Sequence, residues 1–141
     1  MKNIAVVYWS GTGNTAAMAE AVAKGARSAG ASATVLTADA FDGSRVDAFD
    51  AIAFGCPAMG SEELEDSEFL PMFQSCEDKL SGKTIALFGS YGWGAGDWMA
   101  NWEETCRGDG AVLACDSVIC CEAPDDEAAA ACAALGAALA K

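Results

Sequence analysis

Short apolar runs alternate with segments of helical character along the chain. Four of these runs, and a weaker fifth, are nearly continuous, which is typical of strands buried on both faces of a parallel sheet. The segments between them repeat apolar residues at helical spacing or are rich in helix-forming residues. The patterns predict strands at residues 4–9, 34–36, 51–56, 84–88 and, with interruptions, 112–121, and helices at residues 15–27, 67–80, 96–107 and 125–140, with a short one at 44–49.

This alternation of strand and helix, five times over, predicts an α/β fold. Parallel neighbours need crossover connections, and right-handed crossovers place helices on both faces of a doubly wound, five-stranded parallel sheet. The chain of 141 residues is long enough for a substantial core, and it shows no linker or internal repeat. We therefore expect residues 1–141 to form a single domain.

The charge of the chain is strongly acidic and unevenly distributed. Eight Lys and Arg residues oppose 21 Asp and Glu residues, which gives a net charge of −13. Residues 61–141 hold 16 of the acidic and 4 of the basic residues, a net charge of −12. Such a surface repels nucleic acid and anionic membranes and favours partner proteins with basic patches.

The side chains available for chemistry exclude several kinds of site. The absence of histidine excludes His-based acid–base catalysis and imidazole metal ligands. The seven cysteines form no C-x-x-C pair, which disfavours a disulfide framework and a zinc or iron–sulfur site. We expect them to be buried small apolar residues in a reducing cytoplasm. The adjacent Cys120 and Cys121 are an exception, since neighbouring residues of a strand point to opposite faces.

The beginning of the chain leads directly from Met1-Lys2-Asn3 into the first expected strand, without the pattern of a signal peptide. No apolar stretch is long enough to span a bilayer. We therefore expect a cytoplasmic protein without a membrane segment.

The turn between the first strand and the first helix has the composition of an anion site. Glycines let the backbone close around a phosphate, and the N–H groups at a helix start can donate to it. No Lys or Arg lies between Lys2 and Lys24, so neutral donors would hold the phosphate, unlike in the lysine-containing loop of nucleotide hydrolases. A plain β-to-α turn with polar caps uses the same residue types. The residues concerned are Ser10, Gly11, Thr12, Gly13, Asn14 and Thr15.

Two further loops follow the third and fourth expected strands. The first contains Pro57, Ala58, Met59, Gly60, Ser61 and Glu62, and taken alone it would equally suit a proline-containing turn before an acidic helix start. The second contains Ser90, Tyr91, Gly92, Trp93 and Gly94. Large aromatic side chains between glycines favour a flat ligand that stacks on them. Trp98 and Trp102 lie one turn apart in the next helix and are expected in the core.

These three loops resemble, in order and spacing, the FMN-binding loops of the flavodoxins. Residues 10–15 read Ser-Gly-Thr-Gly-Asn-Thr and are similar to the Thr/Ser-x-Thr-Gly-x-Thr pattern that wraps the FMN phosphate. Residues 59–62 and 89–94 resemble the short-chain flavodoxins of anaerobic bacteria. The resemblance runs from Lys2 to the last expected helix. It implies a flavodoxin-like sheet of strand order 2-1-3-4-5, with FMN bound non-covalently at the carboxyl ends of strands 1 and 3.

The resemblance also implies roles for individual residues around the flavin. The Ser90 hydroxyl would bind the phosphate, and the Glu62 carboxylate would accept from flavin N3–H. Met59 would pack on one face of the ring and Trp93 on the outer face. The backbone N–H groups of Gly92 and Trp93 would point to flavin O2.

Two positions of the loop after the third expected strand bear on redox chemistry and on phosphate binding. Rotation of the peptide after Gly60 would present its carbonyl to N5 when the first electron and a proton arrive, which stabilises the neutral semiquinone. Pro57 stands where some relatives have a serine, and proline offers the phosphate neither a hydroxyl nor an N–H.

The function implied is that of an acidic flavoprotein for electron transport, not an enzyme. It would carry one electron at a time at low potential, cycle mainly between semiquinone and hydroquinone, and substitute for ferredoxin. The expected partners are redox enzymes with basic docking patches, namely ferredoxin or flavodoxin reductases and low-potential acceptors, and the protein is expected to be a monomer that binds neither nucleic acid nor membrane.

Two other functions fit the same topology. An FMN-dependent NAD(P)H:quinone or nitro reductase would need a substrate pocket over the ring, which Trp93 would fill. A phosphoacceptor receiver domain would need an acidic pair after the first strand and an Asp at the end of the third. This chain has Trp9-Ser10 and Cys56-Pro57 at these places, which argues strongly against the receiver domain.

Overall fold

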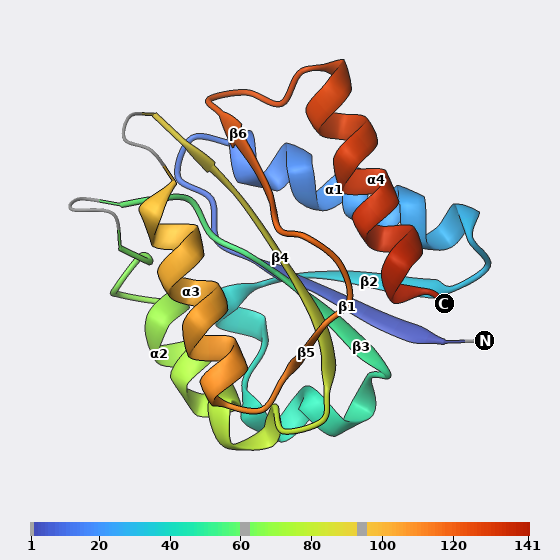
Figure 1. Ribbon diagram of the computed structural model, residues 1–141, viewed down its shortest axis with the longest axis vertical. Coiled ribbons are helices and arrows are strands. Elements are labelled where there is room, and N and C mark those ends of the chain that lie inside the picture. The colour runs from blue at the N-terminus through green and yellow to red at the C-terminus, as the bar shows by residue number, and fades with distance from the viewer. Residues whose placement is uncertain (1, 60–62, 93–95) are drawn as a thin grey trace.

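The computed structural model, which describes residues 2–59, 63–92 and 96–141, contains a parallel β-sheet with helices on both faces (Figure 1). The strands of the sheet are in the order β2-β1-β3-β4-β5, and β6 also pairs with β4. This confirms the predicted order 2-1-3-4-5. The strands are β1 (Asn3–Tyr8), β2 (Ser32–Thr37), β3 (Ala51–Gly55), β4 (Thr84–Tyr91), β5 (Val112–Leu113) and β6 (Val118–Cys121).

The fifth predicted strand is present as two segments, β5 and β6. Both pair with β4: Val112 lies opposite Thr84, whereas Val118 lies opposite Phe88. Residues 114–117 interrupt the edge between them. β2 is longer than predicted, because its pairing with β1 extends from Ser32 to Thr37.

The predicted helices are present, with shifts of a few residues at their ends. They are α1 (Asn14–Ser28), α2 (Phe69–Cys76), α3 (Asp97–Gly108) and α4 (Asp126–Leu139). The helix predicted at 67–80 is divided, since the α-helical hydrogen bonding ends at Cys76 and a 3-10 turn, Glu77–Lys79, continues it. The short segment predicted at 44–49 is also a 3-10 helix, Gly43–Ala48.

Alternate residues of the central strands belong to two separate cores. Ile4 and Val6 of β1 pack with the residues of α1 and α4, whereas Ala5 and Val7 pack with those of α2 and α3. Each of these four side chains is completely buried. Burial on both faces explains the continuous apolar runs and confirms the doubly wound architecture.

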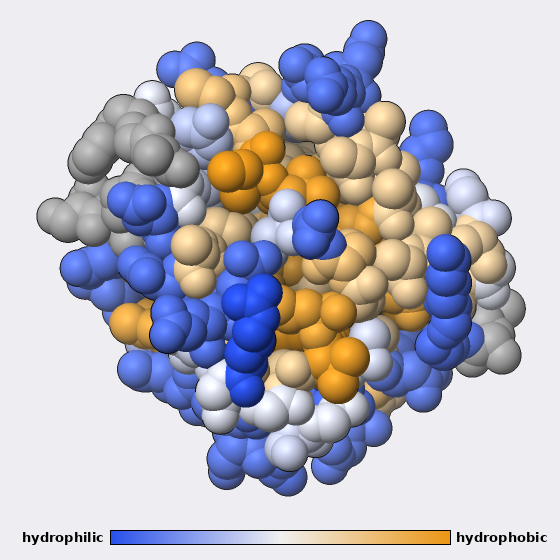
Figure 2. All heavy atoms as spheres, in the orientation of Figure 1, coloured by the Kyte–Doolittle hydropathy of each residue, from blue (hydrophilic) through white to orange (hydrophobic). Residues whose placement is uncertain are grey.

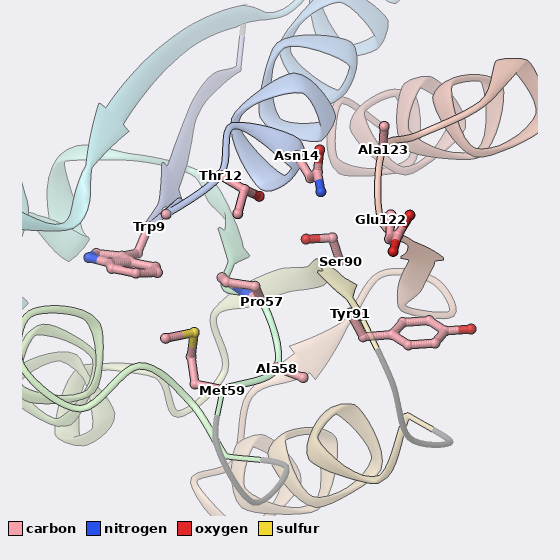
Figure 3. A pocket seen from close by; sticks show the side chains of 12 residues that line it. Trp9, Thr12, Asn14, Pro57, Ala58, Met59, Ser90, Tyr91, Glu122 and Ala123 are labelled. Carbon is pink, nitrogen blue, oxygen red and sulfur yellow. The ribbon is translucent and has the colours of Figure 1, made fainter.

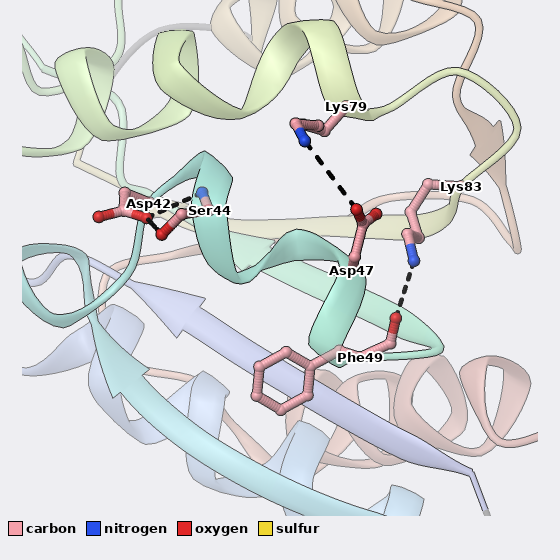
Figure 4. A network of polar contacts seen from close by, with 6 residues as sticks. All are labelled: Asp42, Ser44, Asp47, Phe49, Lys79 and Lys83. Carbon is pink, nitrogen blue, oxygen red and sulfur yellow. Dashed lines mark hydrogen bonds and ion pairs between the residues drawn. The ribbon is translucent and has the colours of Figure 1, made fainter.

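Polar contacts stabilise the connection between β2 and β3 and link it to the segment between α2 and β4 (Figure 4). Asp42 accepts from the Ser44 N–H at 2.9 Å and so begins the 3-10 helix. Lys79, at the end of the turn after α2, pairs with Asp47 at 3.9 Å. Lys83, just before β4, donates to the Phe49 carbonyl at 2.8 Å. The start of β3 is thereby held against the segment between α2 and β4.

One face of the molecule is more apolar than the net charge suggests (Figure 2). Apolar residues gather over β5, β6 and the alanine-rich α4, and hydrophilic side chains surround them. Val112 in β5 is 51% exposed and Ile119 in β6 is 38% exposed. Within residues 2–59, 63–92 and 96–141, no helix has both the length and the apolarity needed to cross a bilayer.

The cysteines follow the prediction only in part. All seven are free, and Cys56, Cys76, Cys106 and Cys132 are buried. Burial raises the pKa of the Cys56, Cys106 and Cys132 thiols to about 12, which keeps them unreactive. The expectation of burial is wrong for Cys115, which is only half-buried because it lies between β5 and β6 on the open edge of the sheet. As predicted, Cys120 and Cys121 face opposite ways, one half-buried and one exposed.

Candidate functional site

A cavity of about 520 Å³ lies where β1, β3, β4 and β6 end (Figure 3). Parallel strands end at a common edge, so the loops after them converge there. Four loops contribute to the wall. The lining residues are Trp9, Gly11, Thr12, Asn14, Pro57, Ala58, Met59, Ser90, Tyr91, Gly92, Glu122 and Ala123.

The first turn of α1 borders this cavity and is suited to an anion. Gly13, just before the helix, has a φ of 96°, which glycine adopts without strain. Its N–H donates to the Ser10 hydroxyl oxygen at 3.0 Å, which closes the turn. No side chain of the described residues caps the helix, and its first turn holds no acidic residue. The free N–H groups and the helix dipole therefore favour a negatively charged group.

The structure brings nine of the seventeen predicted site residues together around the cavity: Gly11, Thr12, Asn14, Pro57, Ala58, Met59, Ser90, Tyr91 and Gly92. Ser10 and Gly13 line an adjoining hollow beside Thr37 and Glu68, and Thr15 is buried behind the turn. Gly60, Ser61, Glu62, Trp93 and Gly94 lie outside the described residues.

A buried hydroxyl pair joins the first helical turn to the end of β4. The Thr15 and Ser90 hydroxyl oxygens lie 3.0 Å apart, and the two residues are 1% and 4% exposed. Ser90 also lines the cavity, and Figure 3 shows its hydroxyl directed toward the space below Thr12 and Asn14. Thr15 therefore holds Ser90 in place beside the anion-favouring turn.

Trp9 forms one wall of the cavity, a role that the sequence did not indicate. Its Nε1 donates to the Glu68 carboxylate at 3.1 Å, which fixes the ring. A Cβ on Gly11 would lie 3.1 Å from the Trp9 ring. Because glycine has no Cβ, the turn after β1 can pass close to the indole. The only signal in the sequence is the place of Trp9, directly after β1.

The loop after β3 is fixed at both sides of residues 60–62. Before them, the Ala58 N–H donates to the Ser90 carbonyl at 3.0 Å. Met59 and Glu63 exchange two backbone hydrogen bonds of 2.8 and 3.0 Å. Met59 is 37% exposed and lines the cavity, so it belongs to the site and not to the core.

Aromatic residues support the loop after β4. The Tyr91 and Trp98 rings lie 5.7 Å apart, and Trp98 Nε1 donates to the Cys56 carbonyl at 3.2 Å. Trp98 therefore links the loops after β3 and β4. Trp98 and Trp102 are 2% and 3% exposed, which confirms the prediction that both belong to the core.

Glu122 is a second lining residue that sequence reasoning missed. It follows β6, and its N–H donates to the Tyr91 carbonyl at 2.7 Å. Its φ of 59° is the only positive φ of a non-glycine residue in the described part of the chain. Such backbone strain is concentrated at functional sites. The rule that parallel strands end at one edge would have pointed to it.

Glu65 has a structural role within the acidic loop. Its carboxylate accepts backbone N–H donors from Ser67, Glu68 and Phe69 at 2.8–2.9 Å, and also the Ser67 hydroxyl. Burial alone would raise the pKa of Glu65, but these hydrogen bonds outweigh it and lower the pKa from 4.5 to about 2. The residue therefore caps the start of α2 as a stable anion.

Comparison with known proteins decides the family of this chain. Residues 6–136 match the family model described as Flavodoxin. The chain is 44% identical over 138 residues to the flavodoxin of Megasphaera elsdenii, with 98% of each chain covered, and 44% identical over 121 residues to that of Clostridium beijerinckii, with 86% of this chain and 88% of the relative covered. The solution structure of two-electron reduced Megasphaera elsdenii flavodoxin matches 97% of this chain and 98% of its own, with a TM-score of 0.90.

The chain belongs to the flavodoxin family. As a flavodoxin it binds FMN and acts as an electron carrier for redox partners, and it is an electron-transfer protein rather than an enzyme. Both relatives come from anaerobic bacteria, which confirms the resemblance on which the prediction rested.

The residues of the flavodoxin cavity fit FMN on physical grounds. The volume of about 520 Å³ lies within the range of roughly 300–1,000 Å³ that cofactor sites occupy. The uncapped start of α1 suits the phosphate, and Trp9, Met59 and Tyr91 offer apolar surface for a ring. The lining residues that the structure describes include no Lys or Arg, so a phosphate there would be held by neutral donors.

Proposed function

We propose that this flavodoxin carries one electron at a time at low potential, that its bound FMN cycles mainly between semiquinone and hydroquinone, and that it substitutes for ferredoxin. The observation that supports this most is the electrostatic character of the cavity. Among the described residues, its lining offers neutral donors and a carboxylate, Glu122, but no cation. An added negative charge is disfavoured there, and a cost of about 1.4 kcal/mol lowers a one-electron potential by roughly 60 mV.

The proposed one-electron transfer is tested by following the visible spectrum of the purified protein during stepwise anaerobic reduction with dithionite. We expect the oxidised flavin bands to give way first to the long-wavelength absorption of the neutral semiquinone and then to bleach. The predicted Gly60 carbonyl acceptor would stabilise the intermediate. Bleaching in a single two-electron step would contradict the proposal and favour the reductase alternative. If the protein bound no FMN, the proposed function would fail and only the assignment of the fold would stand.

We further propose that the predicted residues hold FMN in the manner of the family. The turn formed by Ser10, Gly11, Thr12, Gly13, Asn14 and Thr15 would bind the phosphate together with Ser90. The loops Pro57, Ala58, Met59, Gly60, Ser61, Glu62 and Tyr91, Gly92, Trp93, Gly94 would bind the ring. The convergence of nine of these residues on one cavity supports the assignment.

A Ser90→Ala substitution tests the phosphate assignment. Because a neutral hydrogen bond contributes about 0.5–1.5 kcal/mol, we expect FMN to bind about two- to tenfold more weakly. Riboflavin, which lacks the phosphate, serves as the matched control and should bind both proteins equally. Titration of each flavin by fluorescence quenching measures both affinities. Equal losses for FMN and riboflavin would show that the serine only supports the fold of the loop.

The proposed partners are redox enzymes with basic docking patches, such as ferredoxin or flavodoxin reductases and low-potential acceptors. The net charge of −13 supports this choice, since opposite charges accelerate encounter. We expect electron transfer to a basic cytochrome c to slow steeply as ionic strength rises from about 0.01 to 1 M, because the Debye length falls from about 30 to 3 Å. Stopped-flow kinetics measure the rates. Ferricyanide, an anionic acceptor, should show the opposite trend, and the same trend for both would contradict charge-guided docking.

We also propose that residues 1–141 form one FMN-binding domain that acts as a monomer in the cytoplasm. Both hydrophobic cores draw residues from β1, β3 and β4, which supports a single folding unit. The free cysteines support a reducing compartment. The high net charge, through mutual repulsion of copies, supports a monomer.

A further inference from the structure

The outer edge of the sheet at β6 is unpaired within residues 2–59, 63–92 and 96–141. β6 pairs with β4 on one side, and no described strand lies on its other side. Its residues read Val-Ile-Cys-Cys, without the Lys or Pro that commonly protects a free edge. Ile119 is 38% exposed and belongs to the apolar face seen in Figure 2. The β6 edge therefore offers both backbone groups and apolar surface to another chain.

The backbone groups of two β6 residues point away from the sheet. Glu122, directly after β6, donates its N–H to the Tyr91 carbonyl of β4 at 2.7 Å. Because the backbone groups of successive strand residues point to opposite sides, those of Cys120 also face β4, whereas those of Ile119 and Cys121 face outward. Within the described part of the chain, no hydrogen bond outside the sheet joins Ile119 or Cys121 to another backbone group.

Carboxylates lie at both ends of β6 and beside it. Asp116 comes two residues before the strand and Glu122 directly after it, and both are exposed. A groove of about 350 Å³ lies between β6 and the start of α4, and Asp125 and Glu127 are among its lining residues. The described lining of this groove includes no Lys or Arg. The surroundings of β6 therefore favour an occupant with basic side chains at its ends.

The β6 edge leads directly to the flavin cavity. Glu122 and Ala123, which follow the strand, line that cavity. Tyr91 and Ala123 line both the cavity and the groove between β6 and α4. A segment that lies along β6 therefore reaches the rim of the cavity that holds FMN.

We propose that the β6 edge docks an extended segment of a redox partner, which adds a strand beside β6 and places a basic side chain at each end, against Asp116 and Glu122. The outward backbone groups of Ile119 and Cys121 form the hydrogen bonds, as in other cases of strand addition. A second copy of this chain is a poor occupant, because its net charge of −13 opposes the approach. The assignment to a redox partner rests on the proposed electron-carrier function, whereas the strand pairing does not.

The pairing is tested on the FMN-bound, oxidised protein with the synthetic peptide Arg-Val-Thr-Val-Thr-Arg, blocked at both ends. Hydrogen exchange of the ¹⁵N-labelled protein reports each backbone N–H separately. We expect the peptide to slow exchange at Ile119 and Cys121 and to leave Cys120, which faces β4, nearly unchanged. Unchanged exchange at Ile119 and Cys121 would overturn the proposal. Slow exchange there without peptide, growing with protein concentration, would also overturn it, because a second copy would then occupy the edge.

Two N-methylated forms of the peptide separate strand pairing from attraction between charges. One form carries methyl groups on both valine nitrogens and the other on both threonine nitrogens, so each form blocks one edge of the extended peptide. Only one edge pairs with β6, so one form should bind about tenfold more weakly than the other, or weaker still. Equal affinities of the two forms would contradict strand addition.

The charge of the β6 edge is tested with Asp116→Lys. We expect it to bind the unmethylated peptide about two- to tenfold more weakly. Asp78→Lys makes the same change in charge at an exposed position after α2 and should bind the peptide like the wild type. Equal affinities of the two variants would refute the role of Asp116. Because binding is measured without reduction of FMN, failure of the one-electron carrier would leave these results unaffected, and failure of the peptide to bind would leave the carrier unaffected.

Discussion

An alanine at position 136 is expected to lower the free energy of unfolding by at least about 2 kcal/mol. Gly136 lies in α4 where this helix packs on α1, and a Cβ on it would be 2.0 Å from the Val22 carbonyl oxygen and 2.9 Å from the Ala26 nitrogen. Both atoms belong to a helix backbone, so the helices would have to separate. Overpacking of this kind costs about 3 kcal/mol, and the higher helix propensity of alanine returns only about 1 kcal/mol.

A glycine of α1, Gly25, approaches the backbone of α4 equally closely. A Cβ on Gly25 of α1 would lie 2.0 Å from the Ala133 carbonyl oxygen of α4, so Gly25→Ala should cause a similar loss. The double variant should lose less than the sum of the single losses, because the separation forced by one methyl group makes room for the other. Additive losses would show that the two glycines act through separate contacts.

Urea unfolding in the presence of saturating FMN measures these effects. Gly108→Ala is the matched control: it also lies in a helix, but apart from its chain neighbours and the nearby backbone of its own helix, no described heavy atom comes within 4 Å of its added Cβ. It should leave the protein equally stable or raise the free energy of unfolding by up to about 1 kcal/mol. If Gly136→Ala behaved like Gly108→Ala, the close approach of α1 and α4 would not exist.

The importance of the glycines at the crossing of α1 and α4 could not be predicted from the sequence. A glycine inside a helix looks like a weak position, and only the distance to the neighbouring backbone shows that it is required. The sheet was easier to predict. Ile4 to Val7 face two cores in alternation, so their run of apolar residues predicted a strand buried on both faces. In the sequence, the break between β5 and β6 was visible only as residues that interrupt the apolar run at 112–121.

The candidate site was predictable where a loop has an unusual composition. The glycine-rich turn after β1 and the aromatic loop after β4 stand out from ordinary connections, and residues of both line the cavity. Trp9 and Glu122 were missed because a single residue next to a strand carries no pattern. Their place depends on the three-dimensional convergence of strand ends, which the topology supplies and the local sequence does not.

The acidic loop after β3 illustrates a different limit. In the sequence, Glu65 is one of several carboxylates in a row and looks like part of a solvated face. In the structure it is 6% exposed and collects four hydrogen bonds at the start of α2. No pattern in the sequence separates it from Glu63, which is exposed.

The substitution Glu65→Gln is expected to destabilise the protein by about 2–3 kcal/mol at pH 7, because hydrogen bonds to a charged group contribute about 1.5–3 kcal/mol. One carboxylate oxygen accepts from Glu68 and Phe69, and the other from Ser67. An amide would replace one of these acceptors with a donor. Glu104→Gln removes the same charge from an exposed position and serves as the control, with stability expected to be unchanged.

The effect of Glu65→Gln should also depend on pH in a defined direction. The pKa of Glu65 is lowered from 4.5 to about 2 in the folded protein, so the folded state favours the anion. This difference corresponds to about 3 kcal/mol of stability, fully present above about pH 4.5 and lost as the pH falls toward 2. The gap in unfolding free energy between wild type and Glu65→Gln should therefore be constant from pH 7 to about 5 and shrink below it. Urea unfolding at each pH measures this difference in unfolding free energy. If the difference stayed constant down to the lowest pH at which both proteins fold, the hydrogen bonds at the start of α2 would not hold the carboxylate as an anion.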